Sequence, residues 1–424
     1  MLDSNNRLIY KIRASSLGRQ FRFRCVALVL VLCCFSWVTS VLCSAQDHDV
    51  LCSDGSGSFQ AEFHTGVSVQ VKATRTEELA TRTCEAALRW DKQSLIVAAN
   101  VSQLDVDTFG VDLGLGAPAA GFQVKKSSAS CCMEYEIYSL EKPPRLLRTL
   151  TGGDFFSAAD SDLDGRVEIW TDDAAAVDGF ENLSLAELGS PPVVVLRFLR
   201  GHLLDVSSEF QTYFDREIEE LRKELDSDSL RDFKASDGKL SPTTPISAER
   251  IHRLRVVKAR VLEIVWAYLY SGREQRAWSS LTDMWPEADA DRIHAAILNA
   301  SGRGISAQVD GASKAPQRNR KRAQVFDAIG ESSSGKLEVV PPEPILLRRP
   351  ALAGTSSKDL QQSEVLLQLL IDSAGKVRWA EPAGKSKIVH PLLIHAATTW
   401  KFIPAFKTGR PVASRMRLAV SLTQ

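Results

Sequence analysis

The C-terminal stretch, residues 363–424, constrains the fold most, because short apolar runs there are separated by glycine turns. Residues 364–372 form an apolar run of strand length, and the run ends in a turn at 372–375. Gly375 can adopt the positive φ angle that a tight turn needs. Residues 376–381 alternate between polar and apolar side chains, which predicts a returning strand.

A helix and one more strand are predicted after this hairpin. Pro391 suits the first position of a helix, and Leu393, Ala397 and Trp400 recur at helical spacing. We therefore expect a helix that reaches Trp400 with these three side chains on one apolar face. A second glycine turn at 408–411 precedes a last strand, so the predicted order is β-β-α-β.

This order resembles the TonB C-terminal domain of bacterial cell envelopes, with Trp-x-Phe-x-Pro at 400–404 and Gly-x-Pro-Val at 409–412. The resemblance covers about one seventh of the chain. It implies a small antiparallel sheet backed by a helix, which receives a peptide segment of an outer-membrane transporter by strand addition. The candidate partner-binding residues on the last strand are Arg415, Arg417, Leu418 and Val420.

The sharpest chemical motif is an acidic loop that follows a predicted strand at 155–159. Carboxylates at its first, third and fifth positions can converge on a cation, a glycine at the sixth permits the turn, and a carboxylate at the ninth can complete the shell. Oxygen ligands without His or Cys favour Ca²⁺ over transition metals. The candidate metal-binding residues are Asp160, Asp162, Asp164, Arg166 and Glu168.

The loop departs from an EF-hand, because Thr171 stands where the twelfth, acidic ligand belongs and the flanking segments read as strands. It resembles instead the calcium loop of FG-GAP and integrin-type blades. Asp172 and Asp173 could contribute further oxygen atoms. The alternative is an Asp-rich surface turn that binds no ion, since Asp and Gly favour turns in any case.

The segment before this loop is predicted to be rich in short strands. Three hairpins are expected, at 59–71, 88–101 and 135–150, which is typical of a β-sandwich or part of a propeller. Four cysteines outside the N-terminal apolar run are candidates for structural disulfides in an exported chain. One of two adjacent cysteines could pair with either of the others. These residues are Cys52, Cys84, Cys131 and Cys132.

The N-terminal residues 1–45 combine arginines, an apolar run at 25–43 and a small-residue exit at Ala45. This pattern predicts a secretory signal peptide. The alternative is an uncleaved anchor that tethers the protein to the inner membrane. Both interpretations place residues 46–424 in the periplasm or elsewhere in the cell envelope.

The whole chain is therefore predicted to be an α+β multidomain protein. Its expected parts are a β-rich, sandwich-like domain at 46–200, a helical middle segment at 201–311, an extended linker at 312–362 and the TonB-like domain at 363–424. The helical segment should contain a helix that starts in a capping box at 208–211 and reaches Leu225, a long helix at 247–270 and shorter helices at 275–284 and 291–298.

The leading functional hypothesis is a non-enzymatic envelope protein that binds a partner by strand addition and acts in transmembrane transport. Its partner would be an envelope protein or a peptide segment of an outer-membrane transporter. The chain lacks a long periplasm-spanning segment and an ionisable residue within the apolar run, so an adaptor fits better than an energy transducer. Equal numbers of acidic and basic residues give no field that would attract nucleic acid.

Two alternatives remain open. The first is a calcium-binding surface or adhesion module built on 46–200. The second is a hydrolase, although the sequence contains none of the common nucleophile, zinc-protease or phosphate-binding motifs.

Overall fold

The computed structural model describes the ranges 59–75, 82–126, 131–240, 247–312, 322–328, 339–347, 364–384 and 391–421. All of these ranges belong to one compact unit, Asp49–Gln424. The predicted signal or anchor segment and Cys52 lie outside the described residues. Among the described residues, no helix is both long and apolar enough to cross a membrane. The fold is mixed α+β, as predicted.

Three antiparallel sheets make up the β-rich part, and one short parallel strand extends the third. The first sheet consists of β1 (Phe59–Glu62), β2 (Val67–Arg75), β3 (Arg82–Trp90) and β4 (Gln93–Val101). The second consists of β5 (Gln103–Asp112), β6 (Pro118–Lys125), β7 (Met133–Ser139) and β8 (Arg145–Gly153). The third consists of β9 (Phe156–Ala159), β10 (Glu168–Asp172), β11 (Val193–Leu199), β12 (His202–Asp205) and β13 (Gly311–Ala312). The three predicted hairpins are confirmed, but β5 and β6 were not predicted.

The second sheet is the middle layer of the β-rich part. Val106 and Phe122 face a core shared with the first sheet, whereas Tyr135 and Ile137 face a core shared with the third. β5 is consequently buried along almost its whole length. A strand buried on both faces shows no clean polar and apolar alternation, and the sequence prediction depended on that alternation.

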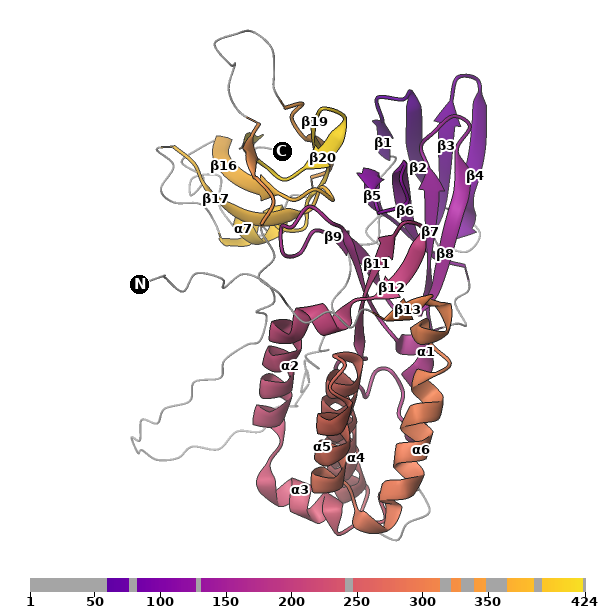
Figure 1. Cartoon of the computed structure of the whole chain (residues 1–424), viewed down its shortest axis with the longest axis vertical. Coiled ribbons are helices and arrows are strands. Elements are labelled where there is room, and N and C mark those ends of the chain that lie inside the picture. Colours follow the sequence, from indigo (N-terminus) through magenta and orange to yellow (C-terminus); the bar gives the residue numbers. More distant parts are fainter. Residues whose placement is uncertain are drawn as a thin grey trace, which may run out of the picture. The chain divides into compact units, whose positions relative to one another are not determined.

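The helical segment forms a separate apolar core around Trp266 and Trp285, both buried. Its helices run beside one another (Figure 1). The side chain of Ser247 caps the longest helix by accepting a hydrogen bond from the amide of Arg250 (3.3 Å). The helices of this segment are α2 (Gln211–Glu224), α3 (Ser227–Lys234), α4 (Ala248–Tyr270), α5 (Glu274–Met284) and α6 (Ala290–Ser301), and the short helix α1 (Ala174–Val177) precedes them in the chain.

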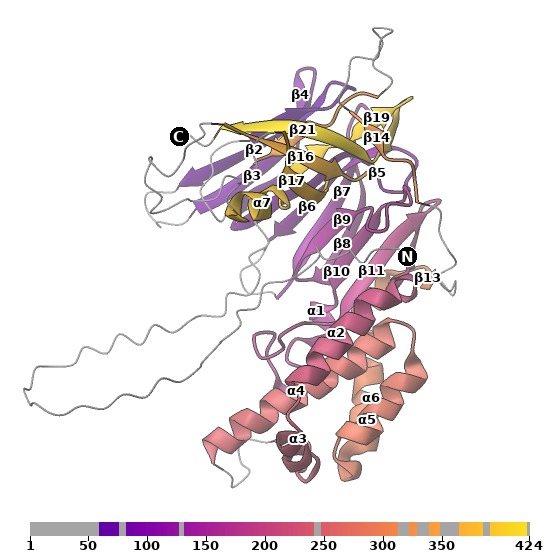
Figure 2. The same ribbon diagram turned by 90° about the vertical axis from the view of Figure 1, so that its left-hand side faces the viewer.

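The C-terminal part contains the predicted β-β-α-β elements with additional short strands. A sheet of β14 (Phe326–Asp327), β21 (Ser414–Ser421), β16 (Glu364–Ile371) and β17 (Val377–Pro382) carries α7 (Pro391–Ala397) on one face (Figure 2). The remaining strands pair in twos: β15 (Glu343–Leu346) with β18 (Lys401–Ile403), and β19 (Ala405–Lys407) with β20 (Arg410–Val412). Two described stretches of the predicted linker thus pair with this part.

The predicted helix is too long, because α7 ends at Ala397 and Trp400 lies beyond it. The amides of Thr399 and Trp400 bond three residues back, which tightens the chain into a turn. The hydroxyl of Thr398 also donates to the carbonyl of His395 (2.7 Å). Trp400 is still buried in the core of this part, so its apolar role is confirmed although its helical position is wrong.

Buried ion pairs join the C-terminal part to the middle sheet. The ammonium of Lys376 lies 2.5 Å from a carboxylate oxygen of Asp107, and Lys401 pairs with Asp105. The aspartates are almost fully buried on β5, with exposed fractions of 2% and 4%. Gly375 allows the close approach within the C-terminal part, since a Cβ atom there would lie 1.8 Å from the carbonyl oxygen of Phe402.

We expect Lys401→Met to lower the free energy of unfolding by about 3–5 kcal/mol, because it leaves Asp105 as an uncompensated buried charge. One carboxylate oxygen of Asp105 already has no hydrogen-bond partner. Urea denaturation measures the change. The matched control is Lys92→Met at an exposed position, which should change stability by less than about 0.5 kcal/mol. Addition of Asp105→Asn to Lys401→Met should recover part of the loss, and a purely additive double variant would contradict the pairing.

Candidate functional site

The acidic loop connects two neighbouring strands of the third sheet, β9 and β10. Asp160 at its first position organises the turn through both carboxylate oxygens. Oδ1 accepts from the amide of Asp164 (2.9 Å), and Oδ2 accepts from the amide of Gly165 (3.0 Å). Gly165 has a φ of +85°, a left-handed conformation that glycine adopts readily, and the sequence predicted a turn at this sixth position.

Three carboxylates of the loop converge. Asp160, Asp162 and Glu168 can each offer an oxygen atom such that all three atoms lie within 4.8 Å of one another. Asp160 and Glu168 are fully buried and Asp162 is half-buried. This spacing is compatible with oxygen ligands around a single cation.

The other two predicted metal-binding residues do not join this group. The carboxylate of Asp164 accepts from the backbone amide (2.9 Å) and the guanidinium (2.5 and 3.0 Å) of Arg166. Burial raises the pKa of Asp164, but the hydrogen bonds from Arg166 outweigh it and hold the pKa below its usual range. The Asp164 carboxylate is therefore already paired with Arg166, which leaves three carboxylates for an ion.

Burial shifts the electrostatics of the three-carboxylate cluster. Burial raises the pKa of Asp160 to about 6 and that of Glu168 to about 8. Arg197 opposes the second shift, since its guanidinium donates to Glu168 (2.6 and 3.1 Å), but it also serves Glu209 (2.7 Å). Glu168, whose pKa lies above neutral, would release its proton when a cation binds.

The hairpin turn between β16 and β17 contacts the same loop. The hydroxyl of Ser373 donates to Asp160 Oδ2 (2.9 Å), and the amide of Asp160 donates to Asp372 Oδ2 (3.1 Å). Arg378 donates to the carbonyl of Ser161 (3.3 Å). The sequence predicts only a turn at Asp372 and Ser373, and nothing local in it indicates their contact with the acidic loop.

Asp172 and Asp173 are directed away from the cluster. Asp172 accepts from the amide of Asp154 (2.7 Å), and Asp173 accepts from the hydroxyl of Tyr270 (2.7 Å) and the amide of Ile305 (2.9 Å). The two residues tie the third sheet to the loop before it and to the helical segment. We therefore do not count them as ligands.

Cys131 and Cys132 form a disulfide with each other. The expectation that one of them pairs with Cys52 or Cys84 does not match this bond. Both residues lie before β7, which begins at Met133. Cys84 is also disulfide-bonded.

The four predicted partner-binding residues divide between the two faces of β21. Leu418 and Val420 pack into the core beneath α7, whereas Arg415 and Arg417 are exposed on the opposite face. The backbone edge of β21 is the feature they share. β14 occupies its first two positions, and beyond Arg415 no described strand pairs with that edge.

Backbone hydrogen bonds show which groups point outward from this edge. The carbonyls of Ala413 and Arg415 accept from β14 and from Ala328 just after it, at 3.0 and 2.9 Å. Alternation along a strand then directs the amides and carbonyls of Arg417, Ala419 and Ser421 outward as well. These groups form a template for an additional strand.

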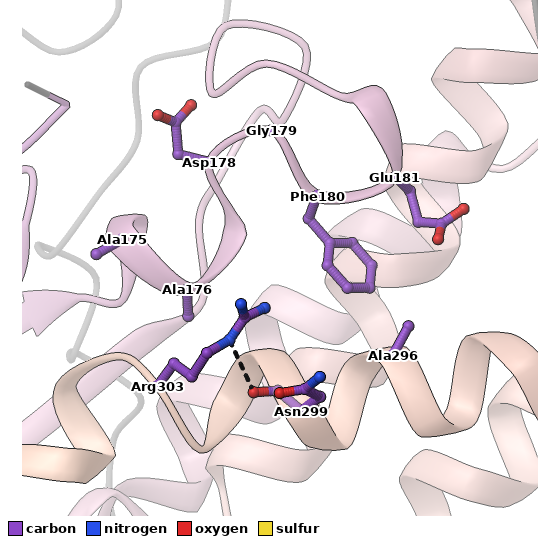
Figure 3. Close-up of a pocket in the computed structure, with 9 residues that line it drawn as sticks. All are labelled: Ala175, Ala176, Asp178, Gly179, Phe180, Glu181, Ala296, Asn299 and Arg303. Atoms are coloured by element: carbon purple, nitrogen blue, oxygen red, sulfur yellow. Dashed lines mark hydrogen bonds between the residues drawn. The ribbon is translucent and has the colours of Figure 1, made fainter.

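A hollow of about 430 Å³ lies between the turn after α1 and the C-terminal half of α6. The ring of Phe180 and the guanidinium of Arg303 point into it, whereas the carboxylate of Asp178 points away (Figure 3). Arg303 Nε donates to the carbonyl of Asn299 (3.2 Å) at the negative end of the α6 dipole. Because that end of a helix disfavours an anion, the guanidinium serves the helix and we assign the hollow no ligand.

Comparisons with protein families, curated proteins and solved structures found no match to this chain. The TonB resemblance therefore stays a prediction that rests on its motifs.

We expect Asp172→Asn to become more stabilising, relative to the wild type, as the pH rises. Burial raises the pKa of Asp172 from an ordinary 3.8 to about 7. Between these values the folded state keeps a proton that the unfolded state releases, so the contribution of Asp172 to stability falls with rising pH. Asparagine retains the acceptor for Asp154 and removes the titration.

Urea denaturation at pH 5 and pH 7 tests this expectation. The difference between variant and wild type should grow by at most about 1.4 kcal/mol per pH unit. Asp283→Asn, at an exposed position of α5, is the control. A difference independent of pH would contradict the raised pKa.

Proposed function

We propose that this protein is a non-enzymatic component of the bacterial cell envelope that binds a partner by β-strand addition along β21. The observation that carries the proposal is the outward backbone edge of β21 beyond Arg415, which no described strand covers. Main-chain hydrogen bonds supply the affinity in this mode of recognition. The TonB-like motifs and the predicted export signal support the same assignment.

The contacts of the C-terminal part suit an adaptor better than a domain that moves freely at the end of a linker. This part is joined to the β-rich layers through Lys376 and Lys401, so a strand bound at β21 would be coupled directly to the rest of the compact unit. A peptide segment of an outer-membrane transporter that binds at β21 would thereby be connected to the β-rich layers of this protein.

The proposal predicts a specific photocrosslink in intact cells. A photoreactive p-benzoylphenylalanine in place of Ala419, whose backbone faces outward, should form an adduct with an extended segment of another envelope protein. The same residue in place of Leu298, which is 46% exposed on α6, is the control and should form no such adduct. Mass spectrometry identifies the crosslinked peptides.

Two results would contradict strand addition at β21. Adducts confined to this chain would show that the edge has no external partner. Equal adducts at both positions would show that the contact at Ala419 is unspecific.

A second candidate function is calcium binding at the acidic loop. The convergence of Asp160, Asp162 and Glu168 favours it, as does the burial that raises the pKa values of Asp160 and Glu168. The role would be structural, because the same loop contacts the hairpin turn at Asp372 and Ser373. The carboxylates would hold the ion, and the ion would stabilise the loop against which the turn packs.

Calcium should therefore raise the melting temperature of the wild type, by an amount equivalent to about 2.7 kcal/mol when its concentration is a hundred times the dissociation constant. Asp162→Asn should lose most of this shift because it removes a converging charge. Asp164→Asn is the matched control and should keep the shift, since Asp164 is paired with Arg166. Equal shifts in the wild type and Asp162→Asn would reject the loop as the site.

A further inference from the structure

At the first two positions of its outer edge, β21 already pairs with another strand of this chain, β14. β14 runs parallel to β21 and places Asp327 directly beside Arg415. The Asp327 carboxylate lies 3.8 Å from the Arg415 guanidinium. A strand on this edge therefore directs a carboxylate toward an arginine on the face that α7 leaves open.

Arg417 repeats Arg415 one step further along the strand. It is exposed, lies on the same face and has its backbone on the same outward edge. In the part of the chain that the structure describes, no carboxylate is paired with it. Gln368 stands beside it on β16, in register.

A hollow of about 370 Å³ marks the space beside these side chains. Asp327, Gln368, Arg415 and Arg417 line it. The Arg415 guanidinium is paired with Asp327, so a side chain entering from a strand added beyond β14 would meet the guanidinium of Arg417 and the amide of Gln368. A carboxylate fits this pair of donors, because arginine can donate two parallel hydrogen bonds to it.

The opposite face of β21 defines the neighbouring positions of the added strand. Met416 and Leu418 point to the α7 side and are half-buried. Residues of an added strand next to them would extend this apolar surface, since side chains alternate between the two faces of a sheet. The edge thus favours a segment in which an acidic residue is flanked by apolar ones.

We propose that the partner segment at β21 carries an acidic residue opposite Arg417, flanked by apolar residues, and that Arg417 selects for it. This inference rests on the proposed strand addition and adds the chemistry of the partner. The contact between Asp327 and Arg415 on the same edge is the observation that indicates a negative charge on the partner residue.

The test uses the full-length chain and three fluorescent nine-residue peptides of alternating threonine and valine. The central threonine is kept, or replaced by aspartate or by lysine. Fluorescence anisotropy measures the dissociation constants near physiological salt. We expect the aspartate peptide to bind about fivefold more tightly than the threonine peptide, the order of one charged cross-strand pair. The lysine peptide should bind more weakly than either.

Two variants separate the charge preference from strand addition. Arg417→Glu should reverse the preference, so that the lysine peptide binds more tightly than the aspartate peptide. Ala419→Pro should abolish binding of all three peptides, because it removes an outward amide while the inner ladder to β16 is kept. Ala419→Val retains that amide and is its matched control.

The outcomes distinguish failure of this inference from failure of the proposed function. If the peptides bind and Ala419→Pro abolishes binding, but Arg417→Glu leaves the order of affinities unchanged, the acidic preference is overturned and strand addition stands. If no peptide binds, or if Ala419→Pro has no effect, both are overturned. A dimer of the protein that Ala419→Pro converts to a monomer would identify a second copy as the occupant and overturn the inference.

Discussion

The structure depends on how two buried carboxylates in its middle sheet are neutralised. Asp105 and Asp107 point from β5 into a region closed on both sides by other layers. Charges in such a place are tolerated only when they are paired and hydrogen-bonded. Asp107 accepts from Tyr135 (2.8 Å) within its own sheet, but the positive charges come from Lys376 and Lys401. The C-terminal part therefore completes the β-rich layers.

This dependence also connects the acidic loop to the C-terminal part. The strand that leads into the loop, β9, donates an amide at Ala158 to Asp107 (2.8 Å). The loop itself accepts from Ser373 and donates to Asp372 across the same contact. The carboxylates of the acidic loop, the lysine-paired aspartates of β5 and the hairpin turn thus form one continuous polar network. A change of charge at the loop would alter the hydrogen bonds of the turn, since the members of a buried network affect one another.

The same C-terminal part uses its two sides differently. The hairpin turn and β18 face the β-rich layers, whereas β21 directs part of its backbone outward. β14 protects only the first positions of that edge, and an uncovered edge strand is a site that soluble proteins normally block. The outer edge of β21 carries arginines, and no described strand covers it beyond Arg415. This edge is thus the surface at which a partner strand would be selected.

The sequence by itself determined many local elements: the hairpins at 59–71, 88–101 and 135–150, the long helix at α4, the glycine turns and the β-β-α-β order at the C-terminus. Each depends on neighbours within about ten residues, which periodicity and turn chemistry report directly. It also predicted that Asp160, Asp162 and Glu168 converge, because a single loop brings them together. Only the tertiary structure decided that Asp105 and Asp107 meet Lys401 and Lys376, and that Asp164 pairs with Arg166 instead of joining the other carboxylates. Those partners are chosen by packing between layers or by competing contacts, and no spacing along the chain encodes them.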